Sequence, residues 1–197
     1  MSSLSGSALF PQLAGVFDQY ISKNITFRPL ARCDAFPLYV ATQHPEFNQY
    51  LLWSAPQQEA EIVPQIDKLL REQTLRRAMI TSFCDKSTGL WKGLTALRPF
   101  RDGVEMGLWL HPSAWNTGIV LTAGRAVIEI LTQKVPSLPI YNRVMPDNTR
   151  MLRICKSYGF EKTDTVFDTH ANGHQAEFDL LTLNTDKWVP FKDVVTY

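Results

Sequence analysis

Residues 104–127 read VEMGLWLHPSAWNTGIVLTAGRAV, and this stretch decides the fold class. Residues 104–110 alternate in polarity as a half-buried β-strand does, and the apolar residues after Gly118 follow the spacing of a helix over 118–133. A helix start presents unpaired amides and the positive end of the helix dipole, and within this helix no acidic residue comes before Glu129. The stretch therefore predicts a site for a phosphate-sized anion, although a glycine at this position also serves simply to permit a turn.

A second strand–turn–helix unit follows about 30 residues later, at residues 140–160. Asp147 or Asn148 can cap the start of a helix that runs to about Tyr158, and Gly159 can end it in the left-handed conformation. Capping alone explains each of these residues. Their combination with the preceding unit is what calls for a further explanation.

The rest of the chain predicts a mixed sheet with helices packed on it. Strands at 78–84, 90–97 and 104–110 are joined by turn sequences, which indicates an antiparallel meander. Pro64 either kinks the helix expected over 57–77 or marks its true beginning, and His44–Glu46 is expected to be a loop. The other expected elements are helices at 12–21 and 33–40 and strands at 25–30, 140–145, 160–166 and 175–183. The fold class is therefore α/β, of the mixed α+β kind.

Composition excludes several classes of protein. The 197 residues carry 20 Lys+Arg and 19 Asp+Glu, so bulk basic charge cannot hold a nucleic acid. At 45% hydrophobic residues the chain is an ordinary globular one, without an apolar run long enough to span a membrane. The three cysteines lie far apart and no secretory signal is evident, so we expect reduced thiols and a cytoplasmic protein.

Five segments together carry a resemblance to a known family: residues 27–30, 104–110, 114–118, 145–148 and 158–160. In this order and spacing they resemble the GNAT superfamily of N-acetyltransferases, most closely the branch that acetylates ribosomal-protein N-termini. The resemblance implies a central mixed, mostly antiparallel sheet flanked by helices over residues 25–184. Residues 1–24 would then form a helical arm, and residues 185–197 a tail.

The resemblance implies acetyl-coenzyme A (acetyl-CoA) as the cofactor. The family's Q/R-x-x-G-x-G/A turn, whose amides bind the pyrophosphate, matches Trp115 at the first position and Gly118 at the first glycine, whereas Val120 is a departure at the last. The implied cofactor-binding residues are Leu108, Trp109, Leu110, Asn116, Thr117, Gly118, Ile119, Val120, Leu121 and Asn148.

Transfer to an amine needs a base, because a protonated amine cannot attack a thioester. The resemblance points to Glu105 as that base, and a solvated or salt-bridged strand residue is the alternative. The positions where the family places its acid hold Met151 and Cys155. Cys155 is thus the candidate acid, or a small core residue. The gap leaves open a degenerate relative, a binding or regulatory module that acts through a protein partner.

The acceptor is expected to be an amine, either a protein N-terminus or a small molecule. Phe47, Tyr50 and Trp53 stand where relatives build the acceptor pocket, although ordinary core packing also explains them. His170 and His174 have the spacing of a metal pair, but the turn at Asn172–Gly173 favours loop histidines, of which His174 could touch substrate. We expect no metal, no nucleic acid and no membrane span, and a homodimer is left open.

Overall fold

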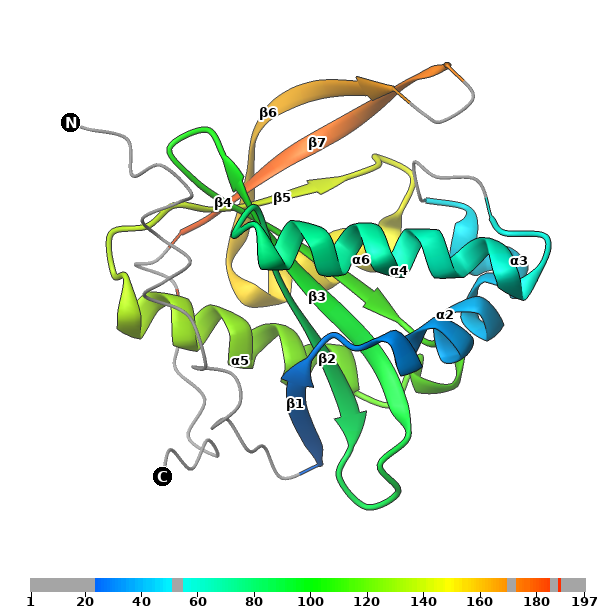
Figure 1. Ribbon diagram of the computed structural model, residues 1–197. Helices are drawn as coiled ribbons and strands as arrows, with labels where there is room; N and C mark the ends of the chain where they lie inside the picture. Colours follow the sequence, from blue (N-terminus) through cyan, green and yellow to red (C-terminus); the bar gives the residue numbers. More distant parts are fainter. Residues whose placement is uncertain (1–23, 51–54, 170–172, 185–187, 189–197) are drawn as a thin grey trace.

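The computed structural model describes residues 24–50, 55–169, 173–184 and 188 (Figure 1). Its seven-stranded sheet has the order β1-β2-β3-β4-β5-β7-β6. The strands are β1 (Ile25–Pro29), β2 (Met79–Asp85), β3 (Trp91–Phe100), β4 (Gly103–Leu110), β5 (Ile140–Val144), β6 (Phe160–Thr169) and β7 (Gln175–Leu183). The α-helices are α2 (Ala35–Thr42), α3 (Pro45–Asn48), α4 (Glu59–Thr74), α5 (Ile119–Lys134) and α6 (Thr149–Tyr158), with short 3-10 helices η1 (Arg32–Asp34) and η2 (Pro112–Ala114). The predicted mixed, mostly antiparallel sheet flanked by helices is confirmed.

The sheet is antiparallel at every pairing except that of β4 with β5. These two strands run parallel and, in the part of the chain that the structure describes, pair only at Val104 with Ile140 and at Glu105 with Tyr141. Residues 106–110 of β4 continue without a partner on β5. The strands therefore diverge in the middle of the sheet, beyond Glu105 on β4 and Tyr141 on β5.

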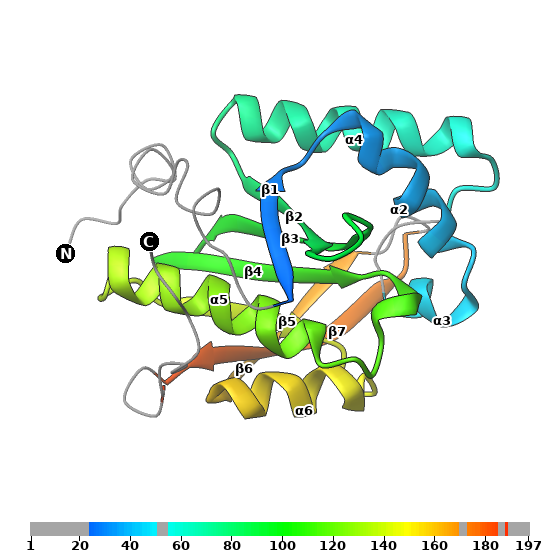
Figure 2. The same ribbon diagram turned by 90° about the horizontal axis from the view of Figure 1, so that it is seen from below.

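Helices lie on both faces of the sheet (Figure 2), and a hydrophobic core lies between the sheet and the helices on each face. Helices α5 and α6 pack on one face, where Val104 and Met106 of β4 belong to the same fully buried cluster as Val127. Helices α2 and α4 cover β2 and β3 on the other face, around Leu38 and Ile66. Since neighbouring strand residues point to opposite faces, Glu105 faces away from α5.

One buried contact fixes α5 against α6. The Tyr158 hydroxyl donates a hydrogen bond to the Val120 carbonyl at 2.6 Å, and a Cβ added to Gly124 would lie 2.3 Å from that hydroxyl. Burial raises the pKa of Tyr158 far above its ordinary value, so the phenol stays neutral and donates. The hydrogen bond from Tyr158 of α6 therefore holds the first turn of α5 in place.

Three details differ from the expectations. The expected loop at His44–Glu46 holds the start of the short helix α3, because Pro45 at its first position is pre-set for a helix. Helix α4 begins at Glu59, so Pro64 does not mark its beginning. Strand β3 continues through Pro99 and β6 through Thr169, beyond their expected ends. The helix expected over 12–21 lies outside the described residues, and the domain boundaries stay a prediction.

Candidate functional site

The start of α5 is built around two residues with positive φ. Gly118 is the residue before the helix, with φ 79°, and Asn116 has φ 60°. A left-handed backbone suits glycine and is tolerated by asparagine. A Cβ added to Gly118 would meet nothing within 4 Å, so the glycine answers a backbone need and leaves open space in front of it.

The amides at this turn are free of backbone acceptors. The first backbone hydrogen bond of the helix start joins the Thr122 amide to the Gly118 carbonyl at 3.2 Å, and no described carbonyl accepts from the amides of residues 116–121. No side chain caps the helix, and its first turn contains no acidic residue. Asn116, Thr117 and Gly118 are exposed. These features fit an anion such as a pyrophosphate.

The last residues of β4, which come just before this turn in the chain, border the region where β4 and β5 diverge. Leu108 and Leu110 pack toward the α5 core, and Trp109 packs toward the opposite core. Just past the divergence on β5, Asn142 is 4% exposed, and its Nδ2 has no hydrogen-bond partner among the described residues. A buried amide without a partner is costly, so an acceptor oxygen entering the divergence would stabilise it.

Asn148 acts first as a helix cap. Its side-chain oxygen accepts a hydrogen bond from the Met151 amide at 3.1 Å, which closes the start of α6. This is the capping role that the sequence predicts. Any contact of Asn148 with a cofactor would use the other end of its carboxamide.

Trp115 anchors the turn before α5 to its surroundings. Its indole Nε1 donates to the Leu110 carbonyl at 3.1 Å. The His44 ring meets the Trp115 ring edge-on at 4.9 Å between centroids, and the Arg150 guanidinium lies 4.8 Å from the same ring. Arg150 also pairs with Glu46 at 3.5 Å. The turn is therefore held between α3 and the first residues of α6.

Glu105 lies at the last paired position before the divergence and forms an ion pair, which is one of the two predicted alternatives for this residue. Its Oε1 and Oε2 accept from Arg143 Nε and Nη2 at 2.7 and 2.9 Å. Arg143 Nη1 donates to Asp168 Oδ2 at 2.6 Å. Burial acts to lower the pKa of Arg143, but the bonds to the two carboxylates outweigh it and the pKa is raised.

Sequence reasoning misses Arg143. The residue was read only as part of a short strand, because nothing in the sequence sets β5 beside β4 in this register. The alternation of β5 does place Arg143 on the same face as Tyr141, opposite Val144 of the core. That signal becomes useful only once the pairing of Glu105 with Tyr141 is known.

Cys155 does not join this constellation. The side chain is 0% exposed and belongs to the core between α6 and the sheet. Burial raises the pKa of the Cys155 thiol to about 12. The position fits the alternative interpretation, a small core residue.

The candidate acceptor residues are spread over different environments. Phe47 is 8% exposed and packs in the core with Leu38, as its alternative interpretation proposes. The Tyr50 hydroxyl donates to the Asp147 carbonyl at 3.5 Å, which brings it to the loop before α6. His174 is exposed just before β7, and Trp53 and His170 lie outside the described residues.

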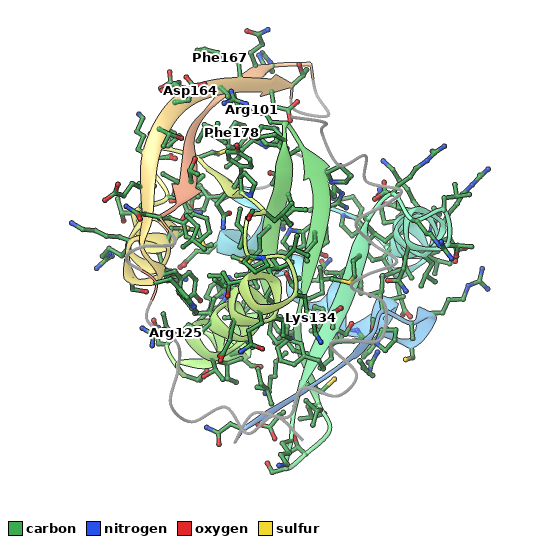
Figure 3. The ribbon with its side chains drawn as sticks, turned by 90° about the vertical axis from the view of Figure 1, so that its left-hand side faces the viewer. Arg101, Arg125, Lys134, Asp164, Phe167 and Phe178 are labelled. Atoms are coloured by element: carbon green, nitrogen blue, oxygen red, sulfur yellow. The ribbon has the colours of Figure 1, made fainter. Side chains whose placement is uncertain are left out.

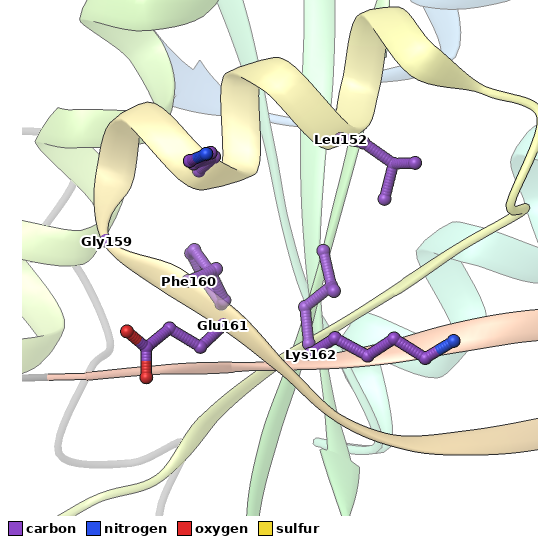
Figure 4. A pocket seen from close by; sticks show the side chains of 7 residues that line it. Leu152, Gly159, Phe160, Glu161 and Lys162 are labelled. Atoms are coloured by element: carbon purple, nitrogen blue, oxygen red, sulfur yellow. The ribbon is translucent and has the colours of Figure 1, made fainter.

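A separate surface pocket of about 450 Å³ lies between α6 and the start of β6 (Figure 4). It is lined by Leu152, Lys156, Gly159, Phe160, Glu161, Lys162 and Leu181. None of the residues predicted to bind cofactor or acceptor is among them. The pocket is therefore distinct from the predicted site residues.

Among the described residues, no helix is long and apolar enough to cross a membrane.

Comparison with known proteins was made for sequence and for fold. A search of functionally curated proteins found no match to the sequence. The fold is similar to a GNAT-family acetyltransferase from Bacillus anthracis (TM-score 0.71, 13% identity, 85% of this chain and 99% of that one). It is similar to ribosomal-protein-S5-alanine acetyltransferase from Vibrio fischeri (0.62, 16%, 87% and 99%). It is also similar to spermidine N-acetyltransferase from Vibrio cholerae, crystallised with CoA and spermine (0.66, 15%, 83% and 96%).

A family model settles what these folds share. The model of the acetyltransferase (GNAT) domain matches residues 24–161, which contain β1 through α6 and so include the diverging strands and the uncapped helix start. The resemblance found in the sequence is thereby confirmed. This chain belongs to the GNAT acetyltransferase family.

Proposed function

We propose that this chain transfers an acetyl group, or another acyl group, from acyl-CoA to an amine acceptor, either a protein N-terminus or a small molecule. The observation that carries the proposal is the uncapped start of α5 beside the divergence of β4 and β5. Acetyl-CoA as cosubstrate agrees with relatives crystallised with acetyl-CoA or CoA. The cytoplasm as its compartment and a homodimer as its assembly stay predictions.

The amides of residues 116–121 would hold the pyrophosphate of the cofactor. Asn142 and Asn148 would contact its pantetheine arm, which would enter the space between the diverging strands. A backbone amide of β4 that has no partner on β5 would polarise the thioester carbonyl. The cosubstrate supplies the activated acyl carbon. The acceptor amine must lose its proton before it can attack, so the chain must supply a base.

Glu105 is the proposed base, acting directly or through a water molecule. The amine nitrogen forms a bond to the acyl carbon, the carbon–sulfur bond breaks, and the proton of the amine goes to the carboxylate. A thiol has an ordinary pKa of about 8.5, so the departing thiolate can take its proton from water near neutral pH. In this scheme the solvent, rather than a side chain of the protein, supplies that last proton.

The first experiment is thermal unfolding of the full chain with acetyl-CoA and with free CoA. A ligand that binds only the folded state stabilises it, by about 2.7 kcal/mol at 100 times its Kd. We expect both ligands to raise the Tm, and dephospho-CoA to test the contribution of the 3′-phosphate. Unchanged Tm values at millimolar ligand would contradict the proposed cofactor site.

The second experiment tests catalysis with Glu105→Gln, using spermine and short peptides with free N-termini as acceptors. Loss of a general base lowers turnover by about 10²- to 10⁴-fold, while the shift in Tm with acetyl-CoA should persist. Glu59→Gln, at an exposed position on α4, is the matched control. If Glu105→Gln transfers as fast as the wild type, Glu105 is not the base.

A non-catalytic binding module remains the second candidate function. Two observations favour it: Arg143 engages both oxygens of Glu105, and Met151 and Cys155 stand where relatives place an acid. Such a module would bind CoA in the first experiment and acetylate none of the acceptors in the second.

A further inference from the structure

We propose that Arg143 is a positioning residue, which fixes the Glu105 carboxylate at the mouth of the divergence while Asp168 fixes Arg143. This inference rests on the proposed function, because it assigns a task to Arg143 in that same transfer. It concerns the face of the sheet opposite α5, where the acceptor amine would have to meet the base.

The first step is the place of the pair in the sheet. Glu105 belongs to the last rung that joins β4 to β5, opposite Tyr141. Arg143 lies two residues further along β5, where the backbones have separated, and its guanidinium reaches back across the opening to Glu105. A side-chain bridge thus continues the connection between the strands where the backbone hydrogen bonds end.

The second step is how firmly Arg143 is held. Its guanidinium donates to three carboxylate oxygens, two on Glu105 and one on Asp168 of β6. It also lies 5.5 Å from the Phe100 ring and 5.9 Å from the Phe178 ring. The Arg143 side chain is 23% exposed and that of Glu105 18%. Partial burial and the planar fork of the guanidinium make this a defined arrangement.

The third step is what this leaves for chemistry. A carboxylate offers about four lone-pair positions on its two oxygens, and Arg143 uses one on each. The other positions remain for a water molecule or an amine. Arg143 therefore restricts the rotation of the carboxylate without occupying all of it, which is what a positioned base requires.

A neighbouring arginine supplies the control. Arg101 follows Phe100 in the turn between β3 and β4, lies 5.6 Å from the same ring, and pairs with Asp164 of β6 at 2.8 Å. Figure 3 labels this pair, with Asp164 in the middle part of β6. Arg101 thus shares the ring contact and a β6 carboxylate with Arg143, but it makes no recorded contact with Glu105.

The test is a double-mutant cycle of acetyl transfer with Arg143→Gln, Glu105→Gln and the double variant. If Arg143 acts through Glu105, Arg143→Gln lowers kcat by about 10- to 100-fold, and the double variant is no slower than Glu105→Gln alone. Arg143→Lys, which keeps the charge but not the fork, falls between Arg143→Gln and the wild type. Arg101→Gln transfers at the wild-type rate.

Several outcomes overturn the proposal. The two single effects could multiply in the double variant, which is the behaviour of a merely structural residue, or Arg143→Gln could transfer as fast as the wild type or faster. The shift in Tm with acetyl-CoA shows in each case that the variant is folded and binds. If the wild type itself acetylates none of the acceptors, the proposed function fails and this inference with it. If Glu105→Gln transfers slowly while Arg143→Gln transfers at the wild-type rate, the inference about Arg143 fails and the proposed function stands.

Discussion

The molecule contains two strand–turn–helix units that differ at one point, the start of the helix. In the unit of β5 and α6, Asn148 caps the helix through the Met151 amide at 3.1 Å. In the unit of β4 and α5, Gly118 precedes the helix and no side chain caps it. The same local fold thus closes one helix start with its own side chain and leaves the other open to a ligand.

The backbone conformation also differs between the two helix starts. Asn116 and Gly118 both have positive φ, 60° and 79°, whereas Asn148 has φ −77°. A left-handed residue other than glycine costs roughly 1–2 kcal/mol, so the turn before α5 is held by contacts elsewhere. The edge-on contact between Trp115 and His44 and the hydrogen bond from Tyr158 to the Val120 carbonyl are such contacts.

The largest expected effect on CoA affinity comes from closing the open helix start. Leu121, 39% exposed in the first turn of α5, is replaced in Leu121→Asp. A carboxylate there competes for the free amides and repels a pyrophosphate, so CoA affinity should fall by about 10-fold or more, from an interaction of about 1–2 kcal/mol. Isothermal titration with acetyl-CoA measures the change in Kd.

The capped helix start supplies the control for this variant. Thr149→Asp adds the same charge to the first turn of α6, where Asn148 already engages an amide. It should cost much less affinity for acetyl-CoA than Leu121→Asp does, because the Asn148 side chain already satisfies the Met151 amide that a new carboxylate would reach. Equal losses in the two variants would mean that the two helix starts do not differ in function.

The difference between the two helix starts could be predicted from the sequence, whereas the partner of Glu105 in its ion pair could not. The local sequence predicts the roles of Gly118 and Asn148, because glycine permits positive φ and asparagine caps helices. The partner of Glu105 depends instead on which strand lies beside β4 and in which register, and the parallel pairing with β5 comes only with the folded chain. The order of strands and helices was predictable since hydrophobic periodicity is local.

Smaller effects are expected from variants of Asn148, which distinguish its role as a helix cap from its proposed contact with the cofactor. Asn148→Ala removes the cap and should lower the free energy of unfolding by about 1 kcal/mol, whereas Asn148→Ser keeps a capping oxygen and loses the amide group. If Asn148 also contacts the cofactor, both variants bind acetyl-CoA more weakly than the wild type. Urea unfolding and titration with acetyl-CoA separate the two properties, and normal affinity in Asn148→Ser would confine the residue to capping.

The smallest change in transfer is expected at Cys155. Its pKa is raised to about 12 by burial, whereas a departing thiolate has an ordinary pKa of about 8.5. Proton donation from Cys155 would therefore run uphill by roughly 5 kcal/mol, at 1.36 kcal/mol per pKa unit. Cys155→Ala should keep kcat within about twofold and lower the free energy of unfolding by about 1 kcal/mol, because a small cavity forms in the core. A large loss of kcat with unchanged stability would restore Cys155 as the acid.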